Sequence, residues 1–338
     1  MSILNLIIYL FTTYLINNFF FNHNKLLKNN TGRLHQLFTN SFAPLSGGII
    51  LLLPVIFIFV EYGKIFIITY CFIFLIGLLS DLNIVSSSKK RFFFQFLIIF
   101  LFVYLTKTEV LPTKINFIDN YLNDFFLSYM LTIFCLLILI NGSNFIDGLN
   151  GLTTTYFLII IFYILKFDLI SYSNFEIEEI IYLAILLIFL LFLNFNNKSF
   201  LGDGGSYSLG FLIGFILIKI YNFNNIISPY YIILLLWYPC FENLFSICRK
   251  KIFGLSPLKP DNYHFHHYVF LFFKLKLNFN DLFANNMSSI SINVYNFIIF
   301  YYASLNFYSS KFQILLLATN LTLYIIIYIF LRKLLNNK

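Results

Sequence analysis

The chain has 338 residues, of which 60% are hydrophobic and only 11% carry a charge, and its mean hydropathy is +0.84. These values exclude an ordinary soluble domain, in which about a quarter of the residues are charged. A net charge of +8 can indicate a nucleic-acid partner, but no basic domain stands outside the apolar runs. The composition therefore predicts an integral membrane protein that binds no nucleic acid.

Apolar runs of membrane-spanning length recur from end to end, which predicts an all-α, polytopic membrane protein forming a single domain, 1–338. The first run lacks the basic leader and cleavage site of a signal peptide, so we expect it to be retained. Eleven spans are predicted, at 3–21, 46–62, 65–80, 92–107, 125–142, 152–168, 179–194, 205–221, 229–247, 290–308 and 312–331.

The distribution of basic residues predicts the orientation of these spans. Sixteen of the 22 Lys and Arg residues fall in one set of connections, which the positive-inside rule assigns to the cytoplasm. The N-terminus is then outside and the C-terminus cytoplasmic. The connections expected to carry the chemistry are 22–45, 81–91, 143–151, 195–204 and 248–289.

Acidic residues on the predicted cytoplasmic side lie mostly within short polar motifs at span ends. Carboxylates are costly there unless they are paired or bind a cation, so they mark candidate functional sites. Five of the six acidic residues on this side lie within such motifs, namely Asp81, Asp147, Asp203, Glu242 and Asp261, and the sixth is Asp281. The four cysteines, in contrast, lie in or beside apolar runs without the spacing of zinc ligands or a disulfide framework.

The stretch 196–210 contains Asp203 between Gly202 and the pair Gly204 and Gly205. Glycines let backbone amides approach a phosphate, and a carboxylate beside them can hold a divalent cation. If a helix starts here, the amides of Gly205 and Ser206 would favour an anion further. A plain polar turn between two membrane helices is the alternative explanation.

Two further motifs carry carboxylates. Asp81 ends a span and is followed by Lys89, Lys90 and Arg91, which suits a cation beside an anionic substrate. A helix cap beside a lipid-binding basic cluster explains that motif equally well. In the other motif, Asn144, Asp147 and Asn150 follow one another at intervals of three, which places them on one helix face. Such a strip suits a cation and a polar headgroup.

The connection 248–289 is rich in basic residues and histidines. The absence of nearby Cys or Glu ligands argues against zinc, so we expect its histidines to bind phosphates or to act as general acids or bases. The motif residues are Arg249, Lys250, Asp261, His264, His266 and His267, with Glu242 preceding them. In the connection 22–45, Lys28 and Arg33 could meet a lipid phosphate or simply follow the positive-inside rule.

Taken in order, these motifs resemble the polyprenyl-phosphate N-acetylhexosamine-1-phosphate transferases, the glycosyltransferase 4 or MraY–WecA family. The resemblance extends from His35 to His267, and the histidine loop is closer to the WecA branch. Corresponding positions are Ser80 and Asp81, then Asn141, Asn144, Asp147, Gly148, Asn150 and Gly151, then Gly202 to Ser206, and finally Arg249, Lys250, Asp261, His264, His266 and His267.

The resemblance implies transfer of HexNAc-1-phosphate from a UDP-HexNAc donor, such as UDP-N-acetylglucosamine, to undecaprenyl phosphate, with release of UMP. It implies a multi-pass protein of the bacterial inner membrane that initiates a surface glycan such as the O-antigen of lipopolysaccharide. The donor, the glycan pathway and a homodimer are left open. A transporter of a lipid phosphate or sugar phosphate is the second hypothesis.

The expected site residues follow from the motifs and the resemblance together. Catalytic roles are expected for Asp81, Asp147, Asp203, His264, His266 and His267. Substrate binding is expected for Asn144, Asn150, Gly204, Arg249, Lys250 and Lys89. Mg²⁺, or Mn²⁺, would be held by Asp203, Asp147 and Asp81.

Three positions depart from the family pattern, and each removes a charge. Ser80 replaces the first Asp of a pair, Asn150 replaces an Asp, and Asn262 replaces an Arg. Ser80 casts doubt on a mechanism that needs a base at that position. Direct attack by the lipid phosphate, with or without Asp81 as base, and a covalent route through an Asp are both left open.

Overall fold

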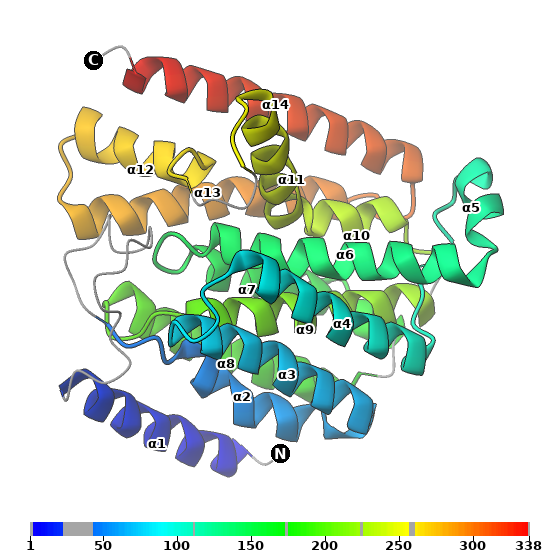
Figure 1. Ribbon diagram of the computed structural model, residues 1–338, viewed down its shortest axis with the longest axis horizontal. Helices are drawn as coiled ribbons and strands as arrows, with labels where there is room; N and C mark the ends of the chain where they lie inside the picture. Colours follow the sequence, from blue (N-terminus) through cyan, green and yellow to red (C-terminus); the bar gives the residue numbers. More distant parts are fainter. Residues whose placement is uncertain are drawn as a thin grey trace.

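The computed structural model describes residues 3–22, 43–110, 112–172, 175–223, 226–256 and 261–336, and within these ranges the chain forms helices and no strand. Most of the long helices lie roughly side by side, while α11 stands across them (Figure 1). The α-helices are α1 (Ile3–Asn22), α2 (Gly47–Ile58), α3 (Lys64–Asp81), α4 (Ser88–Thr106), α5 (Asn116–Leu122), α6 (Phe125–Ile146), α7 (Leu152–Lys166), α8 (Ile177–Phe195), α9 (Gly202–Phe223), α10 (Pro229–Leu235), α11 (Trp237–Ile252), α12 (Phe265–Lys276), α13 (Asp281–Ser304) and α14 (Ser310–Asn336). Two short 3₁₀ helices cover Val60–Tyr62 and Leu169–Tyr172.

Each of the eleven predicted apolar runs overlaps at least one of these helices, so the all-α fold is confirmed. Among the described residues, α3, α6, α8, α9 and α14 are long and apolar enough to cross a membrane. The run 229–247 is one broken unit, because α10 and α11 meet at an angle of 75° and together qualify as a sixth span. The count of eleven spans and their orientation stay predictions.

Helix α9 is the centre of the bundle. It is buried along nearly its whole length and packs against α2, α3 and α6. Small residues make this close packing possible, as at helix contacts in other membrane proteins. A methyl group on Gly77 of α3 would lie only 2.5 Å from the carbonyl oxygen of Asp203. The first turn of α9 is therefore held against α3 backbone to backbone.

The connection that leads into α9 is also fixed by contacts far away in the sequence. The Asn17 amide of α1 donates to the Lys198 carbonyl at 2.8 Å, and Ser46 donates to Asn17 at 2.5 Å. The amide of Gly47, at the start of α2, donates to the Phe200 carbonyl at 3.0 Å. Helices α1 and α2 thus hold the approach to Asp203 in place.

We expect Gly77→Ala to destabilise the protein by about 1–3 kcal/mol or more, because the new methyl group meets backbone atoms that cannot move alone. Thermal or denaturant unfolding of purified protein would measure this loss. Thr319→Ala, on the exposed face of α14, is the matched control and should change stability little. Equal stability of the two variants would contradict the close α3–α9 contact.

Candidate active site

The carboxylate of Asp203 lies in the first turn of α9 and is bonded by side chains of three other helices. Ser80 of α3 donates to Oδ2 at 2.5 Å, and Arg91 of α4 donates to the same oxygen at 2.8 Å. Asn144 of α6 donates to Oδ1 at 3.0 Å. Because the Asp203 side chain is only 8% exposed, these bonds and the Arg91 ion pair compensate its burial.

Asp81, the last residue of α3, caps the start of α9. Its two oxygens accept the backbone amides of Asp203 and Gly204, each at 3.0 Å. A carboxylate at this position also meets the positive end of the helix dipole. Gly202 adopts φ +74°, and a methyl group there would lie 2.7 Å from Asp81 Oδ2, so the cap requires a glycine.

This cap changes the expected anion site. The sequence predicted Gly204 as a substrate-binding residue and predicted that the amides of Gly205 and Ser206 would favour an anion further. In the structure, the Gly204 amide instead donates to Asp81. Asp81 and Asp203 are thus brought together, and the Asp81 carboxylate accepts the backbone amides of Asp203 and Gly204.

Arg91 is the basic residue that reaches this carboxylate cluster. Lys89, which the sequence predicted for substrate binding, is exposed on the first turn of α4. Arg91 donates to both Ser80 and Asp203. The sequence held a clue to Arg91, because the polar Gln95 lies four residues further on and therefore on the same helix face. In the structure Gln95 is buried and accepts a hydrogen bond from the Asn141 amide at 3.0 Å.

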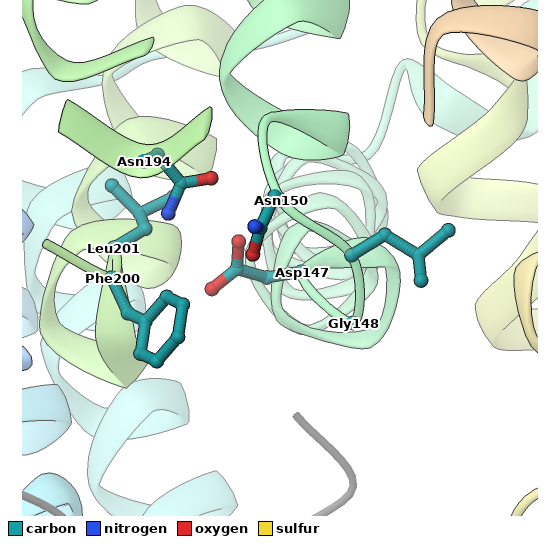
Figure 2. Close-up of a pocket in the computed structure, with 7 residues that line it drawn as sticks. Asp147, Gly148, Asn150, Asn194, Phe200 and Leu201 are labelled. Carbon is teal, nitrogen blue, oxygen red and sulfur yellow. The ribbon is translucent and has the colours of Figure 1, made fainter. Parts of the chain in front are cut away.

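Asp147 lies at the end of α6 and opens into a separate pocket (Figure 2). Figure 2 shows its carboxylate near the side chains of Asn150, Asn194 and Phe200. Asn150 is held on both sides, since it donates its amide to Asn197 at 2.7 Å and its backbone N–H to Asn285 at 2.7 Å. The lining consists of Asp147, Gly148, Leu149, Asn150, Asn194, Phe200 and Leu201. The pocket combines a carboxylate, amides and an aromatic ring.

The described ranges contain no group of three His, Cys, Asp or Glu side chains arranged to hold one metal ion. Binding of Mg²⁺ by Asp81, Asp147 and Asp203 together therefore stays a prediction. The chemistry of the donors near Asp203 nevertheless suits Mg²⁺, which commonly uses one or two carboxylates together with substrate phosphates and water. Because Arg91 already bonds Asp203 Oδ2, an ion at this carboxylate would have to share it with the guanidinium or displace it.

A second cluster forms around the histidine loop. Asp261 binds Arg249 Nη2 at 2.9 Å and lies 3.7 Å from Lys250 Nζ. His264 Nδ1 lies 2.9 Å from Glu242 Oε1. The ring of His264 stacks on that of His266, with 5.5 Å between the ring centroids. The ring centroids of His266 and His267 are 4.3 Å apart. The structure thus brings the predicted residues of this loop together, with the three histidines, Arg249 and Lys250 buried and Asp261 half-buried.

The end of α6 connects the two clusters. Asn144 donates to Asp203, while the next residue, Phe145, packs its ring 5.3 Å from that of His264. Gly148 approaches the His266 ring so closely that a side chain there would overlap it. Figure 1 shows α12, which begins in the histidine loop, near the α6–α7 connection. The predicted motifs therefore meet at one end of the bundle, except Lys28, Arg33 and His35, which lie outside the described residues.

Comparisons with known proteins show what this chain is similar to in sequence. The model of glycosyl transferase family 4 matches residues 64–221. The chain is 27% identical over 209 residues to the probable undecaprenyl-phosphate N-acetylglucosaminyl 1-phosphate transferase of Bacillus subtilis (strain 168), covering 59% of this chain and 56% of the relative. It is 29% identical over 182 residues to the decaprenyl-phosphate N-acetylglucosaminephosphotransferase of Mycolicibacterium smegmatis. This match covers 47% of this chain and 44% of the relative.

A phospho-N-acetylmuramoyl-pentapeptide-transferase of Dictyoglomus thermophilum is 27% identical over 182 residues, which cover 51% of this chain and 58% of the relative. The chain thus spans about half the length of the curated relatives it matches. The segment matched by the family model contains Asp81, Arg91, Asn144, Asp147 and Asp203, the residues that form the carboxylate cluster and its neighbouring pocket. The predicted family resemblance is confirmed for the part of the chain that the model matches: residues 64–221 are similar to glycosyl transferase family 4.

Proposed function

We propose that the protein transfers HexNAc-1-phosphate from a UDP-HexNAc donor to undecaprenyl phosphate, giving undecaprenyl-diphosphate-HexNAc and UMP. The observation that carries this proposal is the convergence of Ser80, Arg91 and Asn144 on Asp203, beside the Asp81 cap. The names of the relatives, which are polyprenyl-phosphate sugar-phosphate transferases, support the same class of reaction.

The physical obstacle to this reaction is the repulsion between two anions, the donor diphosphate and the lipid phosphate. Positive charge must therefore lie where they meet. Arg91 supplies it beside Asp203, and Arg249 and Lys250 supply it beside the histidines. Mg²⁺, held by Asp203 with Asp147 or Asp81, would stabilise the charge that develops on the leaving UMP.

The chemical step that fits this arrangement is direct in-line attack. An oxygen of the lipid phosphate forms a bond to the sugar-bearing phosphorus of the donor, and the bond from that phosphorus to UMP breaks. No base at position 80 is needed, since a phosphate oxygen is already anionic at neutral pH. Asp81, bonded to two amides of α9, would orient Asp203.

The remaining residues are suited to holding the donor. The carboxylate of Asp147, the amide of Asn150 and the Phe200 ring line one small pocket, where they would contact a single polar group of a nucleotide sugar rather than the whole molecule. The pocket adjoins the carboxylate cluster, since Leu201 lines the pocket and Asp203 lies two residues further on. His264, His266 and His267, with Arg249 and Lys250, would bind phosphate and sugar oxygens.

The transporter hypothesis fits the structure less well. Transporters commonly place their polar binding groups near the middle of the membrane on broken helices. Here α10 and α11 do form one broken helix. The two clusters, however, lie around the ends of α3 and α6 and the start of α9. Such an arrangement favours chemistry at one membrane surface.

We further propose that eleven spans cross the bacterial inner membrane, with the N-terminus outside, both clusters at the cytoplasmic surface and the C-terminus cytoplasmic. This orientation follows from the positive-inside rule and places the clusters where UDP-sugars are present. The product would initiate a surface glycan such as O-antigen.

Asp203→Asn should reduce UMP release at least about 100-fold, because it removes the negative charge that Arg91 and a metal ion would both contact. The measurement is UMP formed by membranes supplied with UDP-HexNAc donors, undecaprenyl phosphate and Mg²⁺. Asp281→Asn, which removes a partly exposed carboxylate paired with Lys274, is the control and should keep activity. Full activity of Asp203→Asn with folded protein would refute the assigned role, and UMP release independent of undecaprenyl phosphate would refute the reaction.

Reporter fusions would test the orientation. A fluorescent protein fused after residue 338 should fold and fluoresce when the chain is produced in a bacterium, because the C-terminus is expected in the cytoplasm. A fusion of the same reporter in the predicted outer connection after Lys114 should stay dark. The reverse pattern would show that the orientation, and with it the cytoplasmic site, is wrong.

A further inference from the structure

Glu242 is a deeply buried carboxylate to which the proposed chemistry assigns no role. It lies in α11 and is only 1% exposed. A carboxylate at such depth is strongly destabilising unless its oxygens are hydrogen-bonded or paired with a cation. Its partners therefore decide what it does.

Those partners come from two other parts of the bundle, the start of α12 and the helix α14. On Oε1, Glu242 faces His264 Nδ1 at 2.9 Å and accepts the backbone N–H of Phe265 at 3.3 Å. On Oε2 it accepts the hydroxyl of Tyr324 from α14. Tyr324 is itself buried, and its ring packs on that of Phe265 at 4.8 Å. The carboxylate is thus fixed in position before any substrate arrives.

This arrangement sets the proton on His264. A carboxylate oxygen only accepts hydrogen bonds, so the facing Nδ1 of His264 must carry a hydrogen. The other ring nitrogen, Nε2, then points to the opposite side, where Asp261 Oδ1 lies 3.4 Å away. Asp261 is also the residue that binds Arg249 and Lys250. His264 Nε2 therefore faces the Asp261 carboxylate, which Arg249 and Lys250 also contact.

We infer that Glu242 is a positioning residue for His264, with Tyr324 holding Glu242 in turn. The carboxylate holds a hydrogen on Nδ1 and fixes the ring orientation, so that Nε2 is aimed at the side of the cluster where Asp261 lies and where a phosphate or sugar oxygen would bind. The catalytic part of this inference rests on the proposed transfer reaction. The charged and titratable groups around His264 are Glu242, Lys250 and Arg249 on α11, Asp261 before α12, His266 and His267 on α12, and Tyr324 on α14.

The opposing explanation is that Glu242 only ties α11, α12 and α14 together. The two explanations differ in what His264 contributes to the effect of a mutation. Glu242→Gln keeps the shape of the side chain but removes its charge, and we expect kcat/KM for UMP release to fall about 10–100-fold. If Glu242 acts through His264, the same change should cost little more in a protein that already carries His264→Gln. Glu178→Gln, an exposed carboxylate at the start of α8, is the matched control and should keep full activity.

A direct measurement of the tautomer does not depend on activity. In the full-length protein labelled with ¹⁵N-histidine and held in lipid nanodiscs, the His264 signals, identified by their loss in His264→Gln, should show hydrogen on Nδ1. In Glu242→Gln the hydrogen should move at least partly to Nε2, because the Gln amide can also donate. An unchanged tautomer in Glu242→Gln would overturn the inference.

The outcomes separate this inference from the proposed function. If the wild-type protein releases no UMP, the transfer reaction fails while the tautomer measurement still decides the Glu242–His264 pairing. If Glu242→Gln costs the same factor with and without His264, the residue is structural and the inference is overturned. Should Glu242→Gln fail to fold, Tyr324→Phe replaces it in both measurements. We expect Tyr324→Phe to lower kcat/KM for UMP release a few-fold, and we expect this loss to disappear in a protein that carries His264→Gln. A loss that persists without His264 would again overturn the inference.

Discussion

The structure depends on the need to satisfy a carboxylate buried at the first turn of a buried helix. Asp203 is bonded by α3, α4 and α6 through Ser80, Arg91 and Asn144, and Asp81 closes the amides of the same turn. Leaving any of these polar groups unpaired in an apolar bundle would cost several kcal/mol. The bonds that satisfy Asp203 therefore also bring together the four helices that form the site.

The departure at position 80 makes sense in this setting. A second acid in place of Ser80 would put two negative charges within hydrogen-bonding distance, which raises the energy of the site unless a cation lies between them. Here a hydroxyl donates to Asp203, and the Arg91 guanidinium contacts both side chains. The protein itself thus supplies the positive charge at Asp203.

The two clusters have different characters but share one support. The carboxylate cluster is built from helix ends that meet backbone to backbone, while the histidine cluster is built from α11, α12 and α14 through buried polar side chains. The end of α6 touches both, through Asn144 on one side and Phe145 on the other. A small shift of α6 would therefore alter both clusters together, which suits a reaction in which two bound anions must be aligned.

The sequence by itself determined the helical membrane fold, because apolar runs report directly on segments that must satisfy their own backbone in lipid. It also singled out Asp81, Asn144, Asp203 and the histidines as candidate site residues, since polar residues at span ends stand out against an apolar background. Only the tertiary structure decided that Arg91 rather than Lys89 reaches Asp203, and that the amide of Gly204, a predicted binding residue, donates to Asp81. It also decided that the run 229–247 bends by 75° between α10 and α11, and that Glu242 faces His264. The physical reason is distance along the chain: Arg91 and Asp203 are 112 residues apart, and Glu242 and Tyr324 are 82 apart. Local periodicity places a side chain on a face of its own helix, but which distant helix it meets depends on how the whole bundle packs.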